Sequence, residues 1–138
     1  MIIHRLTPDD AQLACHVVNI FKSAQPTTDY MTHFLSNPNT YFYIAEIAER
    51  PVGFSLAYKL ERCDEDRPMM FFYEIEVLPD YHRQGIGKAL VNKLKTICEQ
   101  EQYLKMFVFT NESNAPAMHL YRSTGGRQKQ TYDVMFVY

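Results

Sequence analysis

The feature that most constrains the fold is a strand followed by a glycine turn and then by a long amphipathic helix. Residues 69–78 are rich in aromatic and β-branched side chains, which is typical of a strand. The helix is expected from about Gly85 to Gln102, because apolar side chains there recur on one stripe: Ile86, Leu90, Leu94 and Ile97. Such a helix must bury its apolar stripe, so we expect layers of helix and sheet.

The other segments predict the element order β-α-α-β-β-β-α-β-α-β. They are a strand over residues 1–6, helices over 7–22 and from Thr27 or Thr28 to about 37, a hairpin of 41–49 and 52–61, a strand over 104–109, a helix from Ser113 or Asn114 to Gly125, and a closing strand over Tyr132–Tyr138. No linker, internal repeat or low-complexity tract interrupts them. We therefore expect one three-layer α/β (α+β) domain over residues 1–138.

Composition and charge exclude several classes of partner. The net charge is only −2 and no long basic run is present, so neither nucleic acid nor a membrane surface is expected as a partner. Three cysteines are an odd number at wide spacing, and no Cys or His pair has zinc-ligand spacing, so neither a disulfide framework nor a metal is expected. The start of the chain lacks the pattern of a signal peptide, and we expect a cytoplasmic protein.

The turn before the long helix is the clearest candidate binding site. Gly85 and Gly87 have no Cβ atoms that would keep a ligand away from the backbone. The first N–H groups of a helix have no partner within the helix and carry partial positive charge. They can hold an anion, above all a pyrophosphate, and Arg83 and Lys88 would add positive charge.

Two common nucleotide motifs do not fit this turn. A dinucleotide fingerprint would need a third glycine at position 90, which is Leu90. A phosphate-binding P-loop would need glycine at position 82 and Ser or Thr at position 89, which are His82 and Ala89. On spacing alone, a strand-to-helix turn that binds no ligand remains an alternative.

Two stretches resemble the signatures of the GNAT superfamily of N-acetyltransferases. The first is Val77-Leu78-Pro79-Asp80-Tyr81 followed by Arg83-Gln84-Gly85-Ile86-Gly87, and the second is Asn114-Ala115-Pro116-Ala117-Met118-His119-Leu120-Tyr121 with Gly125 after it. The resemblance covers essentially the whole chain, and the stretch from Tyr73 to Gly125 is most similar to the aminoglycoside 3-N-acetyltransferases. It implies acetyl-CoA as co-substrate, no metal, and a mixed, mostly antiparallel sheet of six to seven strands flanked by four helices.

The resemblance also implies which residues bind acetyl-CoA. The strand that ends at Val77 and Leu78 would offer backbone groups to the pantetheine arm and would splay from the next strand. The other implied contacts are Arg83, Gln84, Gly85, Ile86, Gly87, Lys88 and Asn114. Capping of its own helix is the alternative for Asn114. His82 stands where Gln or Arg is usual, so its contact is open, and Gly126 replaces a large apolar residue.

Three residues are candidates for the chemistry. Tyr121 matches the superfamily's general acid for the coenzyme A thiolate, and the alternative is an aromatic side chain of the core. Glu74 and Glu76 lie two apart on a strand, so without a bulge they share one face. Glu74 matches the acidic position of the aminoglycoside enzymes, which implies a base or a water relay, and Glu76 is the second choice. A solvated face is the alternative for both carboxylates.

Together these features predict acetyl transfer to a primary amine of a small cationic acceptor. By resemblance this acceptor is an aminoglycoside, which implies antibiotic resistance. The acidic run Asp64-Glu65-Asp66 would attract a polycation if it borders the acceptor cleft. Acetylation of a protein or peptide amine and a non-catalytic coenzyme A sensor are the alternatives. The expected partner is a small-molecule amine, and a homodimer is left open.

Overall fold

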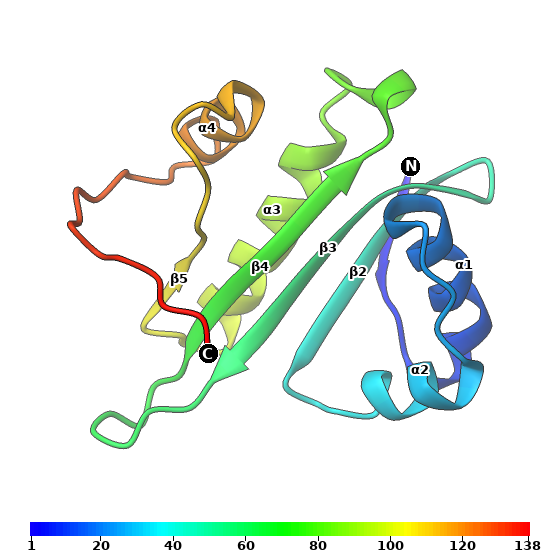
Figure 1. Cartoon of the computed structure of the whole chain (residues 1–138), viewed down its shortest axis with the longest axis horizontal. Coiled ribbons are helices and arrows are strands. Elements are labelled where there is room, and N and C mark those ends of the chain that lie inside the picture. Colours follow the sequence, from blue (N-terminus) through cyan, green and yellow to red (C-terminus); the bar gives the residue numbers. More distant parts are fainter.

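The computed structural model describes all 138 residues and contains one five-stranded sheet (Figure 1). In spatial order the strands are β1 (Ile2–Arg5), β2 (Thr40–Ile47), β3 (Arg50–Leu60), β4 (Met69–Val77) and β5 (Lys105–Phe107). The first four strands are antiparallel neighbours, and β5 lies parallel to β4. The prediction of a mixed, mostly antiparallel sheet is confirmed.

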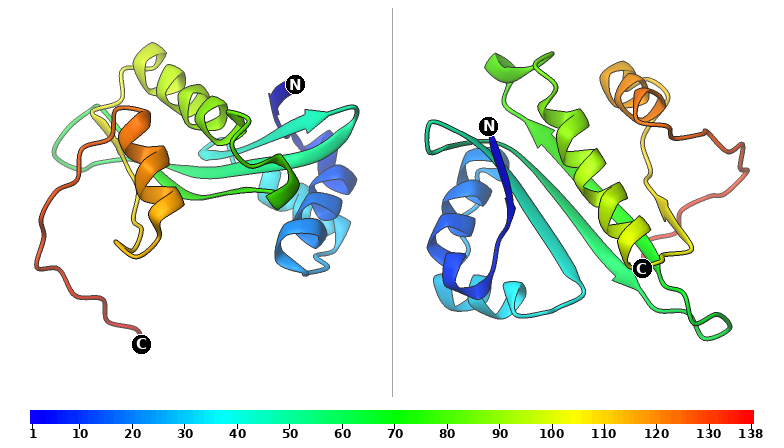
Figure 2. Two further views of the ribbon diagram at one scale, coloured as in Figure 1. Left: turned by 90° about the horizontal axis from the view of Figure 1, so that it is seen from above. Right: turned by 180° about the vertical axis from the view of Figure 1, so that it is seen from behind.

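Helices cover both faces of the sheet, so the three-layer prediction is also confirmed (Figure 2). They are α1 (Ala11–Lys22), α2 (Thr28–Leu35), α3 (Ile86–Gln100) and α4 (Ala115–Ser123), with short 3-10 helices at Pro8–Asp10 and Pro79–Tyr81. One face, the α1/α2 face, carries Phe42, Phe54 and Leu56 under α1 and α2. The opposite face, the α3 face, carries Ala57 and Phe72 under α3. No helix combines the length and the hydropathy that a membrane crossing requires.

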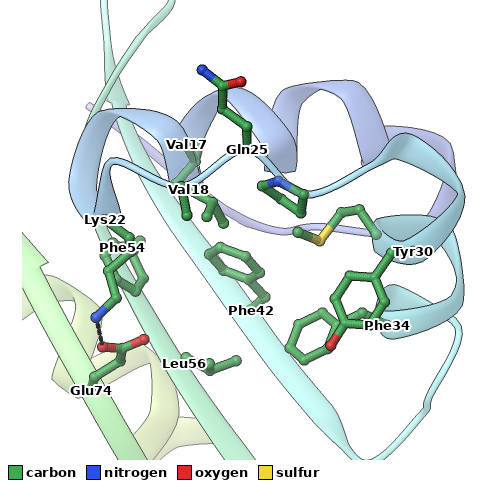
Figure 3. Close-up of a pocket in the computed structure, with 13 residues that line it drawn as sticks. Val17, Val18, Lys22, Gln25, Tyr30, Phe34, Phe42, Phe54, Leu56 and Glu74 are labelled. Carbon is green, nitrogen blue, oxygen red and sulfur yellow. Dashed lines mark hydrogen bonds and ion pairs between the residues drawn. The ribbon is translucent and has the colours of Figure 1, made fainter.

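The first helical segment begins and ends where the sequence predicts. Thr7 N–H donates to Asp10 Oδ2 at 2.8 Å, which forms part of a capping box before the 3-10 turn. The helix ends at Lys22 because Ser23 adopts the left-handed conformation, with φ of 52°. Lys22 is therefore the last helical residue, and its side chain extends from the end of α1 toward the sheet (Figure 3).

A bulge in β4 changes the direction of its side chains. Leu56 of β3 is paired with Glu74, but the next residue, Ala57, is paired with Phe72, so Tyr73 is an extra residue. Phe72 therefore points to the α3 face, beside Ala57, while Glu74 points to the α1/α2 face, beside Leu56. Two side chains that a regular strand would place on one face are thus on opposite faces.

The parallel strands β4 and β5 are paired over only three residues each and then diverge (Figure 1). Met69–Phe71 pairs with Lys105–Phe107, and no strand lies against that edge of β4 from residue 72 to 77. The splay that the resemblance implied is therefore present. It leaves the carboxyl-terminal half of β4 with an unpaired backbone edge.

The sheet has five strands, so the expectation of six to seven strands is wrong. The expected closing strand, Tyr132–Tyr138, has no regular secondary structure (Figure 2). Its large apolar side chains are exposed. A strand needs a neighbouring backbone for its hydrogen bonds, and apolar composition alone does not supply one. The expected strand over 104–109 is likewise limited to Lys105–Phe107, where β4 is its partner.

Candidate active site

The turn between β4 and α3 presents a run of free backbone donors. The N–H groups of residues 83–88 donate no hydrogen bond to the backbone. Arg83 has φ of 60° and Gly85 has φ of 80°, so left-handed residues curl the chain around these donors. Such a nest concentrates partial positive charge, and the N-terminus of α3 adds to it. The turn therefore has the geometry that an anion site requires.

The two glycines of the turn differ in backbone conformation and in what surrounds them. Gly85 caps α3 in the left-handed conformation, and a Cβ atom on it would meet no atom within 4 Å. A Cβ atom on Gly87 would instead lie 3.4 Å from Cδ2 of Leu120 on α4. Gly87 thus faces Leu120 of α4 at ordinary contact distance, whereas the open space of the turn is at Gly85.

The end of β4 offers backbone groups to the side where β5 has diverged. Leu78 N–H donates to Val52 O at 2.9 Å, so the backbone groups of Val77 and Ile75 point to the opposite side. The contact of His82, which the sequence left open, is with the end of β4: its Nε2 donates to Val77 O at 2.7 Å. The Val77 carbonyl and the Leu78 N–H are therefore both already bonded within the chain. Ile75, which the sequence patterns did not indicate, has free backbone groups at this edge.

Tyr121 lies on α4 and packs on the α3 face of the sheet. Its ring meets the ring of Phe72 edge-on, with the centroids 5.7 Å apart. Burial raises the pKa of Tyr121 above its ordinary value, so the hydroxyl keeps its proton at neutral pH. Tyr121 is therefore a core aromatic side chain and, at the same time, a protonated group that could act as an acid.

Glu74 and Glu76 share the α1/α2 face, as the sequence predicts, and one lysine pairs with both. Lys22 Nζ lies 2.5 Å from Glu74 Oε2 and 3.5 Å from Glu76 Oε1. The hydrogen bond to Glu74 raises the pKa of Lys22 above its ordinary value, although burial opposes this effect. Lys22 was not a candidate from the sequence, because nothing in the spacing links residues 52 positions apart.

The acidic run before β4 is not a free negative patch. Arg62 pairs with Asp64 at 3.0 Å, and Arg67 pairs with Glu65 at 2.9 Å. The bonds from these arginines hold the pKa values of both carboxyl groups below their ordinary values. The run also ends before β4 begins, and the five steps of strand from Met69 to Glu74 span about 16 Å. These pairs weaken the expected attraction of a polycation by this loop.

The helix that carries Tyr121 is held at both ends. Asn114 Oδ1 accepts a hydrogen bond from the N–H of Ala117 at 3.2 Å, so the capping alternative for Asn114 is confirmed. At the other end, Lys95 Nζ of α3 donates to Thr124 O at 2.7 Å. These contacts fix the position of Tyr121 relative to α3.

A cavity of about 430 Å³ lies between α1, α2 and the sheet (Figure 3). Its walls are mostly apolar, and Lys22 and Glu74 lie together at one side of it, opposite Tyr30. The principal wall residues are Val17, Val18, Met31, Phe34, Phe42, Phe54 and Leu56. Glu74 is thus the one candidate from the sequence that also lines this cavity.

The sheet is mixed and opens between two parallel strands, beside a turn with the geometry of a pyrophosphate site. The chain belongs to the acetyltransferase (GNAT) family, whose model matches residues 10–125.

Curated relatives of the chain are named N-acetyltransferases. N-acetyltransferase 8 of Homo sapiens is 28% identical over 98 residues, which cover 71% of this chain and 43% of that protein. The ribosomal protein bS18-alanine N-acetyltransferase of Escherichia coli is 40% identical over 53 residues, which cover 38% of this chain and 36% of that protein. The chain spans less than half the length of these relatives.

Solved structures share the fold at low sequence identity. An aminoglycoside acetyltransferase from an uncultured soil metagenomic sample has a TM-score of 0.90 and 23% identity, covering 99% of this chain and 95% of that chain. An aminoglycoside N-acetyltransferase solved with CoA has a TM-score of 0.78 and 18% identity, covering 99% and 93%. At these identities the similarity establishes the fold and leaves the acceptor undetermined.

Proposed function

We propose that the protein is an acetyl-CoA-dependent N-acetyltransferase that acts on a primary amine. The observation that carries this proposal is the run of free N–H groups at residues 83–88, which follows directly on the unpaired edge of β4. A pyrophosphate bound at this nest directs the pantetheine arm along that edge. Membership of the acetyltransferase family supports the same donor, and one structural neighbour was solved with CoA.

Each part of the donor site has a distinct task in this proposal. The pyrophosphate accepts hydrogen bonds from the backbone N–H groups of Arg83, Gln84, Gly85, Ile86, Gly87 and Lys88. The side chains of Arg83 and Lys88 add positive charge. The free backbone groups of Ile75 and the N–H of Val77 bond the pantetheine arm as a neighbouring strand would; the carbonyl oxygen of Val77 is already bonded to His82. Asn114 acts here through its cap on α4.

The bulge in β4 separates the two catalytic candidates onto opposite faces, so a thioester in the opening has Glu74 on one side and Tyr121 on the other. The acceptor ammonium gives one proton to Glu74, directly or through water. The neutral nitrogen then attacks the thioester carbonyl carbon, so that a C–N bond forms and the C–S bond breaks. Tyr121 gives its proton to the thiolate and regains one from the nitrogen, and one proton in total passes to water.

The acceptor that follows from the resemblance is a small cationic amine such as an aminoglycoside. Support comes from the structural neighbours that are named aminoglycoside acetyltransferases, and the 3-N position rests on the sequence resemblance alone. The second candidate is an amine of a protein or peptide, which the ribosomal-protein relative supports. A coenzyme A sensor would need neither an acid nor a base, and the presence of both Tyr121 and Glu74 favours an enzyme.

Binding and turnover on the same sample test this proposal. Calorimetry should detect acetyl-CoA binding, and free thiol should appear when an amine panel is added. Lys88→Glu should lower acetyl-CoA affinity at least about tenfold, because it places a negative charge beside the nest. Lys93→Glu, an exposed change on the same helix, serves as the matched control. Absence of acetyl-CoA binding would refute the proposal, and binding without thiol release from any amine would favour the sensor.

A further inference from the structure

The cavity on the α1/α2 face has an almost continuous aromatic wall (Figure 3). The ring centroids of Tyr30 and Phe34 are 6.4 Å apart, those of Phe34 and Phe42 are 6.4 Å apart, and those of Phe42 and Phe54 are 5.7 Å apart. Leu56 lies beside these rings on the sheet. Such a wall favours an apolar group, because it offers few hydrogen-bond partners for polar groups.

The charged groups of this cavity lie together at one side, where Glu74 is also the proposed base (Figure 3). An acceptor whose nitrogen reaches Glu74 therefore has the apolar cavity directly beside that nitrogen. The cavity and the proposed reaction thus share one carboxylate. The cavity therefore selects which group an acceptor can carry next to its reacting nitrogen.

The local charge suits a molecule with one ammonium group. Lys22 pairs with Glu74 and Glu76, so the three side chains together carry one net negative charge at neutral pH. One incoming ammonium group balances that charge. Further ammonium groups of a polycation would be repelled by Lys22. Against the aromatic wall they would find ring faces but no carboxylate, so cation–π contact alone would have to replace the water that each group loses.

We propose, as an extension of the acetyltransferase function above, that the preferred acceptor is a primary amine with one aromatic or branched aliphatic group, which this cavity receives. The nitrogen displaces Lys22 from Glu74, and the apolar group packs against Phe34, Phe42 and Phe54. An apolar cavity of about 150 Å³ holds benzene, so 430 Å³ accommodates a phenyl or larger group on a short linker. A free small amine and the first residue of a peptide both offer this chemistry.

A panel of acceptors separates these classes by kcat/KM. The panel consists of 2-phenylethylamine, ethanolamine, spermine, an aminoglycoside and a short peptide that begins with phenylalanine. The value for 2-phenylethylamine should exceed that for ethanolamine by about 100-fold or more, because only the former buries a ring in the cavity. A higher value for the peptide than for 2-phenylethylamine would support the same chemistry with a peptide as its source.

A cavity-filling variant tests the location. Val18 lies on α1, is half-buried and lines the cavity, so Val18→Phe fills part of the space. The ratio of kcat/KM for 2-phenylethylamine to that for ethanolamine should fall about tenfold or more. Val134→Phe makes the same change at an exposed position and should keep the ratio. Tyr30→Ala, at a side chain that is 57% exposed, lowers the ratio without altering the core and guards against a misfolded Val18→Phe protein.

The outcomes distinguish this inference from the proposed function. Equal constants for 2-phenylethylamine and ethanolamine, or a larger constant for spermine or the aminoglycoside, would overturn the apolar acceptor while acetyl transfer stands. No transfer to any amine would overturn the acetyltransferase. In that case, saturable binding of 2-phenylethylamine that Val18→Phe weakens would retain the cavity as its site, and no binding would overturn both.

Discussion

Lys22, the last residue of α1, donates a hydrogen bond from Nζ to Glu74 on β4 and also pairs with Glu76. A cation of the protein thus occupies the place where the proposed acceptor must bring its own ammonium group. The exchange of one cation for the other is then part of acceptor binding. Half-exposed ion pairs are weak, so this exchange is feasible for a small amine.

Removal of this internal cation should strengthen acceptor binding. Lys22→Met leaves Glu74 and Glu76 without their cation, so KM for the amine should fall about two- to fivefold at low salt. The gain should shrink as salt rises, because exposed charges are screened over about 8–10 Å. Lys59→Met, which removes a lysine 3.2 Å from Glu61, is the control. An unchanged KM in Lys22→Met would remove Lys22 from the acceptor site.

The role of Glu74 as base should appear in the pH profile of turnover. Glu74→Gln should lower kcat by about 10²-fold at neutral pH, and by much less at high pH, where the free amine needs no base. Glu76→Gln makes the same change two residues further along β4, on the same face, and should have the smaller effect. A loss that is equal at all pH values would indicate a structural role for Glu74.

Tyr121→Phe removes the hydroxyl and keeps the ring, so it tests the two roles of this side chain separately. The ring contact with Phe72 remains in this variant, so the free energy of unfolding should change little. Turnover should fall by about 10²-fold when chemistry is rate-limiting, with acetyl-CoA affinity unchanged. Because burial raises the pKa of Tyr121, loss of its proton should not limit the unmodified enzyme near neutral pH. Unaltered turnover in Tyr121→Phe would leave only the core role.

The two glycines of the turn should respond differently to alanine. Gly85→Ala forces a left-handed residue to carry a Cβ atom and should cost about 1–2 kcal/mol of unfolding free energy. Gly87→Ala adds a Cβ atom within a helix at an ordinary 3.4 Å contact with Leu120, and should be neutral or stabilising by up to about 1 kcal/mol. Urea titration of both variants measures the difference, and equal effects would contradict the assigned backbone roles.

The elements that the sequence predicts correctly are those that depend on local signals. The start of the first helix at Thr7 depends on a capping box, its end at Lys22 on the residue that follows, and the turn before α3 on Gly85. Each of these signals acts within a few residues, so it can be recognised from the sequence alone. The run of free donors at residues 83–88 follows from the same local turn.

The expected strand Tyr132–Tyr138 is a case in which local composition predicts the wrong structure. Its apolar composition resembles that of real strands, yet its side chains remain exposed and no neighbouring strand pairs with it. Strand formation depends on a partner that is distant in sequence, and composition does not identify that partner. For the same reason β5 extends only as far as its pairing with β4.

The sequence by itself determined the family signatures, the helix boundaries and the pair of carboxylates on β4. The tertiary structure alone decided which of these groups lie on the same face and which contact one another. The bulge at Tyr73 turns Glu74 away from Phe72 and Tyr121, and the fold brings Lys22 to that carboxylate across 52 positions. The aromatic cavity beside Glu74 likewise combines side chains from two helices and three strands. Register, bulges and packing depend on contacts between distant segments, and these contacts have no fixed spacing in the chain.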